Sequence, residues 1–263
     1  MTLHDERRDF WEQRLEADWT QTGVGYRALG RSFNTWMYRV RREVFLREAA
    51  ALDLDWPTAQ ILDVGSGTGF YVRGWQALGA GAVTGSDLTE AAVHRLRDRY
   101  PGVGFHRLDI AEPGDTLGEK TFDAVSCMDV LFHVTDDARY VAAIESIARI
   151  VRPGGYFVMS ENFLHGSVQR GANQVNRRLD WITALLERSG FDVVRRTPML
   201  VLMNAQVDAG PLWRKLWGGT LRAATVTEPT GWLAGAALYP LERRLTRSRS
   251  ESPTTELMIC RRR

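Results

Sequence analysis

The sequence predicts an α/β fold built on a doubly wound sheet of mostly parallel strands. Short apolar runs alternate with amphipathic segments between about residues 57 and 204. The first apolar run leads directly into a glycine-rich turn, ILDVGSGTG, and two later runs end in an acidic residue. Strands that alternate with helices are typical of a parallel sheet covered on both faces. Ligands of such sheets bind where the carboxyl ends of the strands meet.

The first segment, residues 1–56, is predicted to be a helical cap. Phe10, Trp11, Leu15 and Trp19 recur at helical spacing. A glycine-marked break, TGVGYRALG, separates them from a second helix over residues 34–52, NTWMYRVRREVFLREAAAL. Pro57 closes this segment.

The core, residues 57–204 and 254–263, is expected to supply seven strands. Their sequences are QILDVG, AVTGSDL, VGFHRLDI, FDAVSCMDVL, YFVMSE, FDVVRRT (with MLVLMNA as an extension) and ELMIC. Thr89 and one of the pair Asp136 and Asp137 are predicted N-caps of the helices that follow them. Residues 205–253 are rich in tryptophan and break the alternation, so they are interpreted as a helical insertion before the final strand.

Composition narrows the class of protein. The net charge of +2 over 263 residues gives no reason to expect a nucleic-acid partner. The longest weakly polar stretch, TGWLAGAALYPL, is shorter than the roughly 20 residues that span a bilayer. The N-terminus carries charges from its start and has no run typical of a signal peptide, so a cytoplasmic location is expected. Neither Cys127 nor Cys260 has metal-ligand spacing, and no metal is expected.

The glycine turn indicates a nucleoside without phosphates. Gly65, Gly67 and Gly69 do not match G-x-G-x-x-G, and no G-x-x-x-x-G-K-[ST] occurs. Asp87 ends the second strand, where a carboxylate can accept both ribose hydroxyls. Asp109 ends the third strand, where a carboxylate can accept from an adenine amino group while Ile110 packs on the ring.

This set of motifs resembles the class I S-adenosylmethionine (SAM)-dependent methyltransferases. The resemblance rests on LDVGSGTG, the acid of GSDL, the LDI after the third strand and the RPGG before the fifth. It implies a Rossmann-like sheet of order 3-2-1-4-5-7-6 with strand 7 antiparallel, and SAM as cofactor. Cys127 and Cys260 would then be separated by strand 5 and remain free thiols. The implied cofactor residues are Asp63, Gly65, Ser66, Gly67, Gly69, Asp87, Leu88, Asp109, Ile110 and Met128, joined by Trp36 and Arg39 from the cap.

Two residues after the fourth and fifth strands are candidates for catalysis. A hydroxyl acceptor needs a base, and His133 titrates near neutrality. Glu161 is the second candidate, either orienting His133 or acting as the base itself. The competing interpretations are that His133 packs against the next helix and that Glu161 is a helix-start or surface carboxylate.

The leading functional hypothesis is an O-methyltransferase for a small, partly apolar metabolite of the sugar or polyketide type, as in natural-product biosynthesis. The alternatives are C-methylation of a prenyl diphosphate and SAM binding without catalysis. No NPPY-like signature follows the fourth strand, which argues against methylation of nucleic-acid bases. A membrane partner is not favoured, although PLWRKLW and GWLAGAALYPLERRL are amphipathic enough for an interfacial role. A homodimer is left open.

Overall fold

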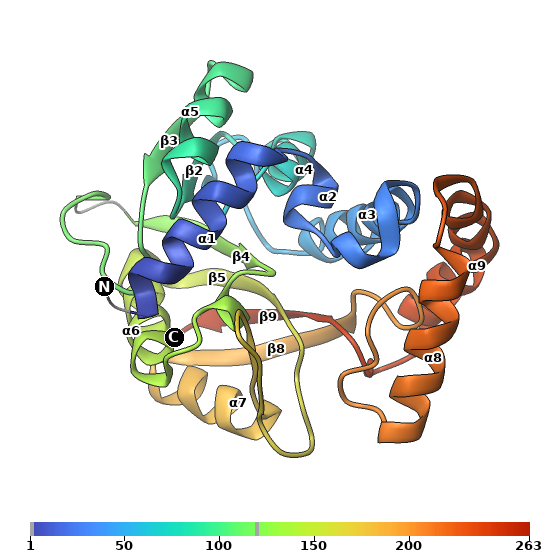
Figure 1. Cartoon of the computed structure of the whole chain (residues 1–263). Helices are drawn as coiled ribbons and strands as arrows, with labels where there is room; N and C mark the ends of the chain where they lie inside the picture. Colours follow the sequence, from blue (N-terminus) through green and yellow to red (C-terminus); the bar gives the residue numbers. More distant parts are fainter. Residues whose placement is uncertain (1–2, 119–120) are drawn as a thin grey trace.

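The computed structural model describes residues 3–118 and 121–263, and its centre is a seven-stranded sheet (Figure 1). The order is β3-β2-β1-β4-β5-β9-β8, with β9 antiparallel to both of its neighbours. The strands are β1 Gln60–Val64, β2 Ala82–Asp87, β3 Gly104–Arg107, β4 Phe122–Met128, β5 Val151–Glu161, β8 Phe191–Pro198 and β9 Glu256–Arg262. The predicted order and the antiparallel last strand are confirmed.

Helices cover both faces of the sheet. One apolar layer holds side chains of α3 Gly30–Ala49, α4 Phe70–Ala77 and α5 Glu90–Arg99, and the other holds side chains of α6 Asp137–Ile150 and α7 Leu179–Arg188. The four central strands β1, β4, β5 and β9 contribute to both layers, so their alternate residues are buried in opposite directions. Thr89 caps α5 by accepting from Ala92 N–H, and Asp136 caps α6 by accepting from Arg139 N–H, as the sequence predicts.

The chain before β1 forms α1 Leu3–Ala17, α2 Gln21–Val24, a 3-10 turn Arg27–Leu29 and α3. Helix α1 crosses the edge of the sheet at which β1, β2 and β4 end (Figure 1). Its Glu12 accepts hydrogen bonds from the N–H groups of Glu90 and Ala91 at the start of α5. A carboxylate at a helix N-terminus is stabilised by the unpaired N–H groups and the dipole there, and this contact fixes α1 on the core.

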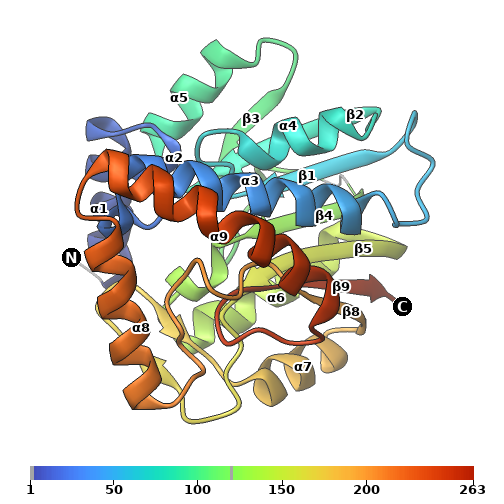
Figure 2. The same cartoon turned by 90° about the vertical axis from the view of Figure 1, so that its right-hand side faces the viewer.

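The segment between β8 and β9 contains two helices, α8 Pro211–Ala224 and α9 Glu228–Ser248. Helix α9 lies along α3 (Figure 2), and Gly235 permits the close approach because a Cβ there would lie 2.3 Å from Trp36 Cδ1. The buried carboxylate of Glu242 accepts from the N–H groups of residues 201 to 203, which ties α9 to the chain after β8.

Two details differ from the sequence interpretation. MLVLMNA forms no strand, because Val201, Leu202 and Met203 donate their N–H groups to Glu242 rather than to a neighbouring strand. A small two-stranded ribbon, β6 Gln169–Arg170 with β7 Val175–Asn176, was not anticipated. Within the described residues, no helix is both long and apolar enough to cross a membrane.

Candidate functional site

The glycine turn lies between β1 and α4, at the carboxyl edge of the sheet. Gly65, Gly67 and Gly69 have φ values of 71°, 53° and 77°, the left-handed region that side chains other than glycine rarely adopt. Ser66 N–H donates to Ser86 O at 2.7 Å, which fixes the turn to the end of β2. The turn therefore brings backbone close to any ligand held at this edge.

Asp63, the last-but-one residue of β1, carries one satisfied and one unsatisfied oxygen. Its Oδ1 accepts from Ser126 Oγ at 2.5 Å, and Ser126 in turn accepts from Trp75 Nε1. Its Oδ2 is buried and has no hydrogen-bond partner among the described residues. Burial raises the pKa of Asp63 to about 7. A buried acceptor without a donor is costly, so this oxygen fits a ligand that brings an N–H or O–H group.

Asp87 lies at the end of β2, beside the turn. Its Oδ2 accepts from Gly67 N–H at 2.9 Å, and its Oδ1 accepts from the N–H and hydroxyl of Thr89 at 3.0 and 2.8 Å. A carboxylate offers about four acceptor positions, and these three hydrogen bonds leave one, on Oδ2, for a ribose hydroxyl. Leu88 follows as a half-buried apolar neighbour.

The end of β3 is more heavily engaged than the sequence suggested. Asp109 Oδ1 accepts from Ala111 N–H at 3.0 Å, and its Oδ2 forms an ion pair with Arg139. Arg139 also pairs with Glu112, which is exposed. Ile110 is buried beside Asp109. An adenine amino group would thus share the Asp109 carboxylate with Arg139.

These groups fit SAM in three respects. The unpaired oxygen of Asp63 can accept from the amino group of SAM. The glycine turn leaves room for the methionine chain of SAM, and Asp87 can accept from its ribose. Leu88, Ile110 and the buried Met128 at the end of β4 offer apolar surface for adenine. The candidates to hold the cofactor are therefore residues at the ends of β1, β2 and β4, which are part of the set that the resemblance implies.

The two cap residues named from the sequence lie elsewhere. Trp36 packs on Trp232 and Tyr239 of α9, with ring centroids 4.9 and 5.1 Å apart. Arg39 is exposed, and its Cζ lies over the rings of Trp36 and Tyr239. The structure brings both residues to the α3–α9 contact and shows no contact between them and the strand ends.

Arg41, two residues further along α3, reaches the strand ends instead. It is 7% exposed and forms an ion pair with Asp129, directly after β4. Asp129 has φ 59°, a strained value for a residue with a side chain, and Ser160 holds it by accepting from its N–H and donating to its Oδ1. Strain of this kind is concentrated at functional sites, which makes Asp129 and its partner Arg41 further candidates for this one.

Sequence reasoning missed Arg41, but a signal was present. Phe33, Met37, Val40 and Val44 form the buried stripe of α3, and Arg41 lies four residues after Met37 and three before Val44. An arginine in a buried stripe needs an anionic partner, because an unpaired buried charge is unstable. The same reasoning applies to Ser126 on the fully buried strand β4.

His133 ends a short 3-10 turn, Leu131–His133, after β4. Its Nδ1 lies 2.6 Å from the carbonyl oxygen of Asn173. A carbonyl oxygen only accepts, so Nδ1 must carry the proton, and Nε2 of the neutral ring holds a free lone pair. Desolvation by burial lowers the pKa of His133 to about 4, so the ring is neutral at physiological pH. Trp11 and Phe132 pack on it, with ring centroids at 4.8 and 4.4 Å.

Glu161 ends β5 and is completely buried. Its Oε1 accepts from Tyr140 Oη at 3.4 Å, and its Oε2 has no partner among the described residues. Arg177 lies over the ring of Tyr140, with Cζ 4.1 Å from the centroid, and also leaves Nη1 unpaired. The structure thus places Glu161 beside Tyr140 and shows no contact between it and His133. Burial raises the pKa of Glu161 to about 8, against the opposing charge of Arg177.

This buried carboxyl makes stability depend on pH. Glu161 stays protonated in the folded chain up to about pH 8, whereas the unfolded residue ionises near pH 4.5. The contribution of Glu161 to the free energy of unfolding is therefore fully present below pH 4.5 and is lost as the pH rises towards 8. In the wild type, the free energy of unfolding measured in urea is expected to fall by on the order of a few kcal/mol between pH 5 and 8.5 because of Glu161. Glu161→Gln is expected to remove this fall.

The comparison of wild type with Glu161→Gln isolates Glu161, because the raised pKa of Asp63 acts in both proteins. Glu187→Gln, which changes an exposed glutamate of α7, is the matched control and should keep the wild-type pH dependence. Parallel curves for wild type and Glu161→Gln would show that Glu161 is ionised in the folded chain.

Sequence comparison links the chain to known enzymes. Residues 62–159 match the family described as "Methyltransferase domain". A protein of Thiobacillus denitrificans named ubiquinone biosynthesis O-methyltransferase is 32% identical over 172 residues, or 63% of this chain and 70% of that protein. A protein of the same name from Alkalilimnicola ehrlichii is 37% identical over 105 residues, and there the chain spans only 40% of the relative's length.

Solved structures share the fold at low sequence identity. Magnesium protoporphyrin IX methyltransferase from Synechocystis with bound SAM aligns with a TM-score of 0.55 at 16% identity, covering 89% of this chain and 84% of that one. The [4+2]-cyclase SpnF aligns with a TM-score of 0.54 at 19% identity, covering 86% and 80%. The sheet order, the glycine turn and the matched relatives together show that the chain belongs to the class I SAM-dependent methyltransferases.

Proposed function

We propose that the protein transfers the methyl group of SAM to a hydroxyl of a small, partly apolar metabolite, with His133 as the base. The observation that carries the proposal is the fixed tautomer of His133. Its Nδ1 proton is committed to Asn173 O, and the low pKa leaves Nε2 deprotonated. A free lone pair beside the carboxyl end of β4 is what removal of a hydroxyl proton requires.

The bound cofactor supplies a methyl group already activated by a positive sulfur. The chain's own task is to hold the acceptor oxygen in line with that carbon and to accept its proton, which passes to Nε2 of His133. Trp11 and Phe132 flank the imidazole and offer an apolar wall for the acceptor. Helix α1, which carries Trp11, also shields this edge from water.

The class of acceptor is inferred from the apolar surface of Trp11 and Phe132 and from the name that the relatives share. Their printed name concerns O-methylation in ubiquinone biosynthesis, which supports a hydroxyl on a ring with apolar substituents. Sugar and polyketide hydroxyls remain in the proposed class. We place the reaction in natural-product or quinone-type biosynthesis on the basis of these names.

C-methylation of a prenyl diphosphate is the second candidate. It needs cations beside the acceptor to hold the diphosphate. Arg41 lies at the strand ends but is already paired with Asp129, and Arg39 and Arg42 of α3 line a pocket on a different flank. Arg14 of α1 acts on His133 but already donates to the carbonyl oxygens of Gly23 and Gly25. The pairing of Arg41 and Arg14 favours the hydroxyl acceptor.

The test is an acceptor screen with SAM labelled in its methyl group. Phenolic, polyketide and sugar alcohols are incubated in parallel with prenyl diphosphates, and labelled products are identified by mass spectrometry. Label on an oxygen of a phenolic, polyketide or sugar acceptor is the expected result. Label on carbon of a prenyl diphosphate would replace the proposal, and SAM binding without transfer to any acceptor would favour a non-catalytic or cyclase-like role.

A further inference from the structure

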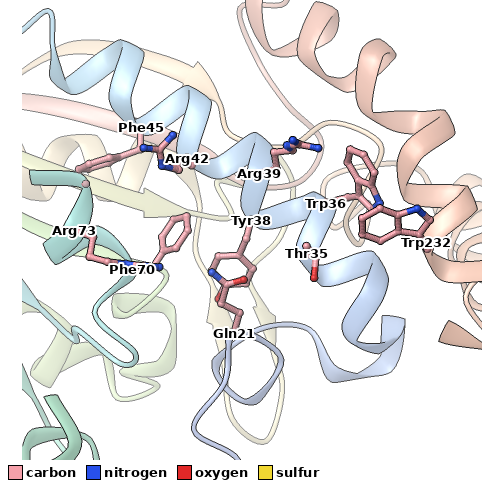
Figure 3. Close-up of a pocket in the computed structure, with 11 residues that line it drawn as sticks. Gln21, Thr35, Trp36, Tyr38, Arg39, Arg42, Phe45, Phe70, Arg73 and Trp232 are labelled. Carbon is pink, nitrogen blue, oxygen red and sulfur yellow. The ribbon is translucent and has the colours of Figure 1, made fainter. Parts of the chain in front are cut away.

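A groove of about 550 Å³ lies on the flank of α3 that faces α4 (Figure 3). It runs along α3 from Thr35 to Phe45, about 15 Å at the rise of an α-helix. Gln21 of α2, Phe70 of α4 and Trp232 of α9 complete its walls. Four separate segments thus build one hollow.

The groove is strongly cationic. Arg39, Arg42 and Arg73 line it, and no acidic residue does. Within residues 3–118 and 121–263, none of the three forms an ion pair with a carboxylate. Other arginines of the same helix are paired: Arg41 with Asp129 and Arg47 with Glu48. Three arginines that line one groove without an anionic partner there offer a site for a carboxylate or phosphate.

Aromatic rings surround these charges. Arg39 stacks on Trp36, with Cζ 5.0 Å from the ring centroid, so its N–H donors point outward in the plane of the group. Tyr38 and Phe70 meet edge to face at 4.9 Å. Trp36 is 9% exposed, and its buried Nε1–H has no acceptor among the described residues. This orphaned donor is a second, independent sign that a ligand belongs here.

The groove is separate from the cofactor edge. None of the residues that line it lies on a strand, and Phe70, which directly follows Gly69, is where the groove comes nearest in sequence to the glycine turn. Tyr38 forms the partition, because its ring lies 6.0 Å from Cζ of Arg41, which points to Asp129.

We propose that this groove binds a small organic anion with a flat apolar body. Its carboxylate or phosphate lies among Arg39, Arg42 and Arg73, and its body stacks on the aromatic walls. Aromatic surface without charge would suit a neutral ligand, and arginines without rings would suit an inorganic ion. The combination of arginines and aromatic rings selects a ligand that carries both an anionic group and a flat apolar body.

Calorimetric titration with phenyl phosphate, benzoate and inorganic phosphate tests the proposal. Phenyl phosphate or benzoate is expected to bind saturably, at least about tenfold more tightly than inorganic phosphate. Which of the two binds more tightly identifies the anionic group. Arg42→Gln combined with Arg73→Gln is expected to weaken that binding at least about tenfold while leaving the affinity for S-adenosylhomocysteine (SAH) unchanged.

The matched control is Arg214→Gln combined with Arg222→Gln, which removes the same charge from two exposed arginines of α8 that form no ion pair within the part of the chain that the structure describes. It should bind the aromatic anion as wild type does. Equal weakening in both double variants, equal affinity for inorganic phosphate, displacement of the anion by SAH, or no saturable binding would each overturn the proposal.

Discussion

Replacing Asp87 by alanine is expected to weaken SAH binding at least about tenfold, measured by calorimetric titration of the purified protein. The carboxylate has one acceptor position left for a ribose hydroxyl, and a hydrogen bond to a charged group contributes about 1.5–3 kcal/mol. It also accepts from Gly67 N–H, so its loss additionally frees the glycine turn. Both effects act in the same direction.

Two further variants make this result specific. Asp98→Ala removes an exposed acid of α5 and should bind SAH as wild type does. Asp87→Asn keeps one acceptor oxygen but not the charge, and should fall between wild type and alanine. Wild-type affinity in Asp87→Ala, with the fold intact by circular dichroism, would move the cofactor away from this edge.

Replacing His133 by glutamine is expected to lower the rate of methyl transfer by about 10²–10⁴-fold, the usual range for loss of a general base. SAH affinity should stay unchanged, because His133 is not among the residues proposed to hold the cofactor. Because the pKa of His133 is lowered to about 4, the wild-type kcat/KM is expected to be flat from pH 6 to 8 and to fall only towards pH 4.

The rate is measured with the acceptor found in the labelled-SAM screen, and His94→Gln, an exposed histidine of α5, serves as the control. A His133→Gln protein with the wild-type rate would exclude a base at this position. A wild-type rate that rises instead through pH 8 would point to Glu161, whose pKa is raised to about 8.

Much of the fold was predictable because the signals are local. The apolar runs of β1, of β4 and of residues 156–161 in β5 are short, bounded and almost fully buried, which is what central parallel strands require. Thr89 and Asp136 cap their helices through hydrogen bonds to residues three positions away. Such contacts join residues that are close in the sequence, so the local sequence is enough to predict them.

The less predictable parts depend on contacts between distant segments. MLVLMNA has the composition of a strand, but Glu242, about 40 residues later, takes its N–H groups. Arg39 and Arg41 are two residues apart, and only the packing of α3 decides that Arg41 meets Asp129 while Arg39 faces α9. Likewise, only the folded chain brings Arg73 beside Arg42 in one groove.

Helix α1 and the residues just after it contact both the glycine turn and His133. Trp19, just beyond its end, donates to Gly67 O at 2.9 Å in the glycine turn, while Trp11 packs on His133. A ligand that steadies the turn therefore also restricts the segment that borders the acceptor. By thermodynamic reciprocity, acceptor binding must then strengthen cofactor binding by the same factor. One N-terminal helix would make the two ligands cooperative although neither touches the other's contact residues, and loosening that helix would uncouple them.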